Sequence, residues 1–177
     1  MEMENKAFYQ ECSAALERLV GLECWGVVAG KGTGSQVLLG FGTKIPWDKP
    51  IKNPYLTEDE RNFSGEFSLF IQQASWRVED AAAVICTWED DNAEGAAMKR
   101  GLERLRGQKV ASVALSFPGF DIDMRFENGV RLAVFSTFAG DKNYDNWDFS
   151  VPECVYNVGE RSRVYRCGHD EIGGLDD

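Results

Sequence analysis

One segment of the chain occurs twice, and this repetition restricts the fold more than any other feature. Leu16–Gly21 and Leu102–Gly107 both read Leu-Glu-Arg-Leu, then any residue, then glycine. Each copy ends a run of apolar residues at helical spacing, which predicts a helix that stops at a glycine. Strand-like sequence follows both helices in the same order. Such collinear self-similarity predicts two related structural units.

The apolar spacing predicts helices over 5–20 and 92–106. Asn5 is the expected N-cap of the first helix, and Asp91 or Asn92 that of the second. Each helix is then expected to end at the glycine of its repeated segment.

Alternating residues predict the strands. Residues 121–126 alternate charged and apolar side chains, the period of a sheet with one wet face. Asn128 and Gly129 then predict a type I′ hairpin turn. Trp76 and Trp147 hold matching places in the two copies, so we expect them to pack in the core and not to stack on a ligand.

These patterns predict an α+β protein built from two degenerate copies of a helix followed by antiparallel β-hairpins, related by a pseudo-twofold axis. The first unit covers 1–88 with a long loop at 42–64, the second covers 89–167, and 168–177 is expected to be a flexible acidic tail. A chain of 177 residues with 44% hydrophobic residues can bury a core without disulfides or metal. The rival interpretation is two independent helix–sheet segments that share ordinary caps and turns.

Charge and cysteine usage restrict the partners and the compartment. A net charge of −10 argues against binding to nucleic acid or to anionic membranes. No apolar run approaches the ~18 residues of a membrane span. The five cysteines are odd in number and contain no C-x-x-C, which favours a reducing cytoplasm. Cys12, Cys86 and Cys154 stand among apolar residues and are expected to be buried.

Residues 30–35 are rich in glycine but do not form a phosphate-binding loop. Gly32 follows Lys31 where Ser or Thr is required, and a strand follows where a helix is required. We therefore expect a turn between two strands.

Neither metal nor catalytic residues form a recognisable set. Asp141, Asn143 and Asp145 have the opening rhythm of a calcium loop, but Asn146 replaces its glycine and the terminal glutamate is missing. His169 is the single histidine and cannot complete a zinc site or a nucleophile pair without distant residues. We predict no catalytic residue, no metal and no cofactor.

Segments that the copies do not share are the predicted binding surface. The first is the 42–64 loop, where Trp47 and Tyr55 could anchor a partner. The second precedes the later tryptophan and contributes Asp141, Tyr144 and Asp145.

Residues 105–152 read L-x-G-x-x-V, then D-I-D-M-R-F-E-N-G-V-R-L-A-V-F, then N-W-D-F-x-V-P. This stretch resembles C-terminal segments of small uncharacterised bacterial proteins, some of which look like immunity proteins for secreted toxins. The resemblance implies a sheet-rich fold and carries no catalytic residue.

We therefore expect a non-enzymatic protein-binding module of bacterial type, such as an immunity protein that neutralises a basic toxin. The alternative is a small enzyme or small-ligand-binding domain with a pocket at the seam between the two units. A third is a subunit whose sheet edges pair between chains. The oligomeric state stays open.

Overall fold

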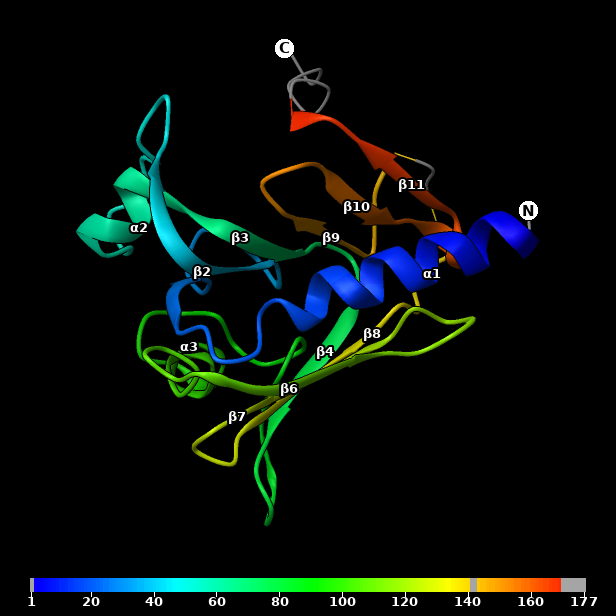
Figure 1. The fold of residues 1–177 in the computed structure, drawn as a ribbon. Helices are drawn as coiled ribbons and strands as arrows, with labels where there is room; N and C mark the ends of the chain where they lie inside the picture. The colour runs from blue at the N-terminus through cyan, green and yellow to red at the C-terminus, as the bar shows by residue number, and fades with distance from the viewer. Residues whose placement is uncertain (1, 141–142, 170–177) are drawn as a thin grey trace.

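The computed structural model describes residues 2–140 and 143–169, which form two antiparallel sheets and a few helices (Figure 1). The predicted α+β class is therefore confirmed. The six-stranded sheet has the order β1 (Cys24–Val28), β2 (Val37–Pro46), β3 (Phe63–Ile71), β9 (Trp147–Ser150), β10 (Val155–Val158), β11 (Val164–Cys167). The five-stranded sheet has the order β5 (Val84–Thr87), β4 (Ser75–Glu79), β8 (Arg131–Phe135), β7 (Ile122–Phe126), β6 (Val110–Leu115).

Helix α1 (Glu2–Glu17) runs along the opening between the two sheets (Figure 1). Cys12 and Leu16 of this helix, and Leu19 in the turn after it, belong to one continuous apolar core shared by both sheets. Trp76 and Trp147 are the largest side chains of this core and are 1% and 0% exposed, as the sequence predicted. This single core joins α1 to both sheets.

Each sheet takes strands from both halves of the chain. In the six-stranded sheet β3 pairs with β9, where Leu69 lies opposite Phe149. In the five-stranded sheet β4 pairs with β8, where Trp76 lies opposite Val134. Neither of the predicted units, 1–88 and 89–167, therefore forms a sheet by itself.

The two helices that the sequence predicted, at 5–20 and 92–106, differ from their expected bounds in the structure. Asn5 lies inside α1, which begins at Glu2, and is therefore not its N-cap; its side-chain amide donates to the Ser162 carbonyl at 3.3 Å. The second helix, α3 (Ala97–Glu103), begins later than expected. Asn92 does not cap it. Its side-chain amide instead donates to the carbonyl of Gly34, in the turn between β1 and β2, at 3.0 Å.

The hairpin between β7 and β8 is present, but its predicted turn type is wrong. Gly129 has a φ of +82°, whereas Asn128 does not have the positive φ that a type I′ turn needs. The Asn128 side chain instead accepts from Val130 N at 3.1 Å and donates to Arg104 O at 3.0 Å. Residues 30–35 form the expected turn between strands.

The five cysteines are free; Cys12 and Cys86 are buried as expected, whereas Cys154 is half-buried. Within the residues that the structure describes, no helix is long and apolar enough to cross a membrane.

Candidate functional site

The 42–64 insertion is an ordered part of the fold. β2 extends into it as far as Pro46, and a short helix, α2 (Glu58–Asn62), precedes β3. Thr57 and Glu60 form a capping box: Thr57 Oγ1 accepts from Glu60 N at 3.2 Å, and Glu60 Oε2 accepts from Thr57 N at 3.0 Å. The insertion therefore has a fixed conformation from which to present side chains.

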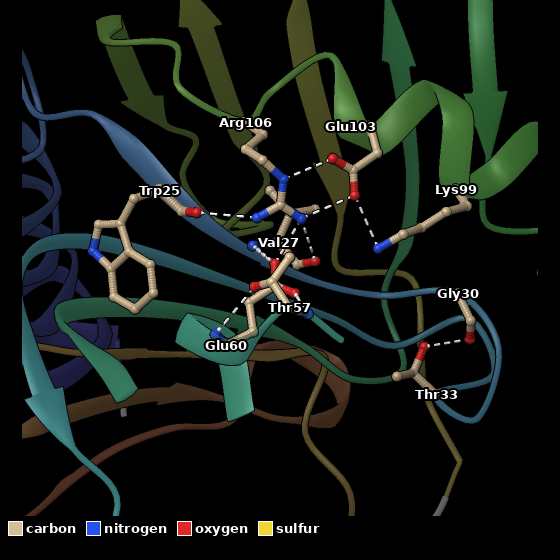
Figure 2. Close-up of polar contacts among 9 residues, drawn as sticks. All are labelled: Trp25, Val27, Gly30, Thr33, Thr57, Glu60, Lys99, Glu103 and Arg106. Carbon is tan, nitrogen blue, oxygen red and sulfur yellow. Dashed lines mark hydrogen bonds and ion pairs between the residues drawn. The ribbon is translucent and has the colours of Figure 1, made fainter. Parts of the chain in front are cut away.

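A buried ion pair ties α2 to the rest of the molecule (Figure 2). The Glu60 carboxylate, which is 1% exposed, lies 2.6 Å from the Arg106 guanidinium and accepts from Val27 N at 2.9 Å. Arg106 also pairs with Glu103 at 2.7 Å, and Lys99 pairs with Glu103 at 2.9 Å. The hydrogen bond from Arg106 lowers the pKa of Glu103 to about 2.

This network holds structure together and leaves no carboxylate oxygen of Glu60 without a donor. A buried charge is tolerated when it is paired and hydrogen-bonded in this way. The cluster therefore supports the insertion, and the candidate site is on the surface that the insertion borders.

A groove of about 870 Å³ lies on the outer face of the six-stranded sheet, beside the insertion. Its floor is a row of outward side chains on neighbouring strands: Leu38 lies opposite Phe70, and Phe70 lies opposite Asp148. Trp47, from the insertion, is part of its wall. Trp47 is held there because its indole Nε1 donates to the Glu60 carbonyl at 3.4 Å.

The groove is acidic as well as apolar. Glu66 and Asp148 line it, and no Lys or Arg among the described residues does so. Ile45, Val151 and Pro152 supply further apolar surface. A cavity that combines apolar walls with a few converging polar groups is the usual form of a binding site.

Asp148 is the most perturbed acid of the groove. Burial raises its pKa to about 7, and the charge of Asp145 raises it further, although the Gln72 amide donates to its carboxyl at 2.7 Å and opposes the rise. Both protonation states of Asp148 are therefore populated near neutral pH. Perturbed acids in clefts concentrate at functional sites.

Asp145 is directed inward. Its carboxylate accepts from the Tyr165 hydroxyl at 2.6 Å and pairs with Arg163 at 3.3 Å, and its side chain is buried. The Tyr165 pKa is raised, first by burial and then by this hydrogen bond.

The five residues predicted to contact a partner do not gather in one place. Trp47 lines the groove, whereas Tyr55 and Tyr144 are 42% and 49% exposed and line no part of it. The Tyr55 ring carries the Lys31 amine 4.6 Å from its centroid. Asp145 is buried as described, and Asp141 lies outside the described residues. Their role as partner contacts stays a prediction.

Sequence reasoning missed Phe70, Asp148 and His169. His169, whose Nε2 lies 2.8 Å from Val151 O, borders the groove. The available signal was the alternation that turns Asp148 away from the core between Trp147 and Phe149. That signal does not reveal that β3 is its neighbour.

No group of three or more His, Cys, Asp or Glu side chains in the described part of the chain is placed to hold a metal ion. Comparison of the chain with protein-family models, curated proteins and solved structures finds no match.

Proposed function

We propose that this chain is a non-enzymatic protein-binding module that receives a basic, partly apolar segment of its partner in the groove on the six-stranded sheet. One observation carries the proposal: the described lining contains two carboxylates and no Lys or Arg, above an apolar floor. A lysine or arginine side chain suits this surface, because its aliphatic stem can pack on Phe70 and Trp47 while its charge meets Asp148.

The overall charge supports the same kind of partner. A net charge of −10 steers a basic protein toward the molecule and makes association sensitive to salt. An immunity protein that masks a basic toxin is one module of this type, and some of the proteins that residues 105–152 resemble look like immunity proteins for secreted toxins.

We further propose that the chain arose by duplication. If β1–β5 correspond to β6–β10, the order β1-β2-β3-β9-β10 becomes β6-β7-β8-β4-β5, which is the order of the other sheet. The Trp76 indole donates to Ser35 O at 2.9 Å, and the Trp147 indole donates to Phe120 O at 3.0 Å. When the two copies are aligned, Gly34 pairs with Gly119, and Ser35 and Phe120 directly follow these two glycines. This agreement supports two copies with an exchanged terminal hairpin.

The duplication bears on function because the groove depends on a part that one copy lacks. Ile45, near the end of β2, and Trp47, just after it, both belong to the 42–64 insertion, whereas β7 and β8 are joined by a short turn. The groove is thus a property of the six-stranded sheet alone, which favours a specific role over a general feature of the repeat.

The second candidate is a small-ligand or enzymatic site in the same groove. It is favoured by the β3–β9 pairing, which places the groove where residues from the two predicted units meet, and by the near-neutral pKa of Asp148. A carboxyl of this kind could exchange a proton with a bound molecule.

The test uses a short peptide in which leucine and lysine alternate, together with its leucine–glutamate counterpart and n-butylammonium. Backbone amide shifts of Phe70 and Ser150 are followed by NMR during titration. We expect saturable shifts with the lysine peptide only, reduced in Asp148→Asn. Equal shifts with the glutamate peptide, or none with either, would refute the proposal. Binding of n-butylammonium as tight as that of the peptide would favour the small-ligand candidate.

A further inference from the structure

A second cleft, of about 890 Å³, lies away from the groove and shares no lining residue with it. One wall comes from the first turns of α1 and from the turn after β6, with Phe8, Phe117 and Pro118. The other wall is the segment that leads into β11, including Arg161 and Ser162.

The backbone around this cleft adopts a conformation that residues other than glycine rarely take. Phe120, Arg161 and Ser162 have φ angles of +58°, +51° and +60°, and no other described residue except glycine has a positive φ. The Phe120 ring packs edge-on against Phe8 and Phe117, at 5.7 and 6.0 Å between centroids. Arg161 and Ser162 therefore line the cleft, and Phe120 is buried behind two of the rings that line it. Strain of this kind concentrates at ligand sites.

Hydrogen bonds between the two walls hold the strained segment in place. Ser162 Oγ donates to Pro118 O at 2.9 Å, and the Asn5 amide donates to Ser162 O at 3.3 Å. The cleft is therefore preorganised, which lowers the cost of ordering it around a ligand.

Arg161 is the cation that this cleft offers to a ligand. Its side chain is exposed, and among the described residues it makes no hydrogen bond or ion pair, whereas neighbouring Arg163 pairs with Glu160 and Asp145. A guanidinium is the preferred partner of a carboxylate because two parallel N–H groups match its two oxygens. Glu4 also lines the cleft and disfavours a ligand with several negative charges.

We propose that this cleft binds a small monocarboxylate with a flat apolar ring. The carboxylate pairs with Arg161, and the ring lies against Phe8 and Phe117, whose faces and edges suit aromatic contact. This site is independent of the groove and of its proposed partner.

The probes for this site are phenylacetate and its neutral analogue 2-phenylethanol. Titration of the full chain is followed through the backbone amides of Phe117 and Ser162. We expect saturable shifts with phenylacetate, and an affinity at least about tenfold lower for the alcohol and for Arg161→Asn, since a charged hydrogen-bond pair is lost. Asparagine tolerates the left-handed conformation, so this variant keeps the backbone.

Arg125→Asn, at an exposed arginine on β7, is the matched control and should bind phenylacetate as the native chain does. Denaturant unfolding of Arg161→Asn should match the native midpoint, which separates lost binding from lost structure. The proposal is overturned if phenylacetate gives no saturable shift. It is equally overturned if 2-phenylethanol or Arg161→Asn binds as well, because the site then takes an adventitious apolar additive only.

Discussion

The indole Nε1 of Trp47 donates a hydrogen bond to the carbonyl oxygen of Glu60 at 3.4 Å. The carboxylate of the same Glu60 lies 2.6 Å from Arg106, on the turn after α3. The wall of the groove is thus fixed to α2, and α2 is fixed to the other half of the chain. One glutamate therefore links the wall of the groove to the stability of the fold.

Glu60→Ala should destabilise the fold by about 3 kcal/mol, because it leaves the Arg106 guanidinium and Val27 N without their buried acceptor. Chemical denaturation measures this free energy of unfolding. Asp59→Ala on the same short helix is the control, since its pair with Lys44 is exposed and contributes ~0.5 kcal/mol. Equal losses for the two variants would contradict the structural role of Glu60.

Trp47→Ala should weaken binding of the leucine–lysine peptide by about tenfold, because it removes a wall of the groove. Tyr144→Ala is the matched aromatic control, since Tyr144 is exposed and lines no part of the groove. Isothermal calorimetry compares the two. A larger loss with Tyr144→Ala would move the binding surface to the segment before β9.

Asp148→Asn should stabilise the protein at pH 8. In the folded protein Asp148 keeps its proton to about pH 7, whereas the unfolded chain releases it near the ordinary pKa of 3.8. The folded state therefore binds more protons between these values, and stability falls as the pH rises through this window. Because water reaches part of the side chain, we expect a gain of about 2 kcal/mol at pH 8, and almost none at pH 4.

Asp123 is the control for this pH profile, because its pKa is shifted in the opposite direction. The hydrogen bond from Arg131 lowers the pKa of Asp123, so its stabilisation is present above pH 3.8 and is lost as the pH falls through the lowered value. Asp123→Asn should therefore lower the free energy of unfolding by up to about 1 kcal/mol at pH 8 and change it little in strong acid. Urea unfolding across pH would expose an error in either sign.

Gly101→Ala should destabilise the protein by about 2 kcal/mol although alanine favours helices. An added Cβ would stand 2.7 Å from Cys86 Cβ and closer still to its sulfur. Overpacking of this kind exceeds the ~1 kcal/mol gain in helix propensity. The double variant Gly101→Ala/Cys86→Ala removes the contact with the sulfur but keeps the close approach to the Cβ of residue 86, so it should recover part of the loss relative to Cys86→Ala. Additive losses of stability in the cycle would show that the Cys86 sulfur is not the obstacle.

Local signals in the sequence located several of the elements, but neither α2 nor the arrangement of the strands. Periodicity located both helices, and alternation located β7, but Asn5 and Asn92 form tertiary contacts where caps were expected. Trp47 was found because an insertion is visible in sequence. Asp148 was missed because its neighbour Phe70 belongs to the other half of the chain, and no local pattern encodes that pairing.

Because each sheet takes strands from both halves of the chain, the fold also has a consequence during synthesis on the ribosome. When residues 1–88 have emerged, β3 still has a free edge, because β9 has not been synthesised. β4 has a free edge for the same reason, since its neighbour β8 comes later in the chain. Free strand edges invite pairing with other nascent chains. Neither sheet can close until the second half of the chain is translated, so a ribosome that stalls midway would release a fragment prone to aggregation.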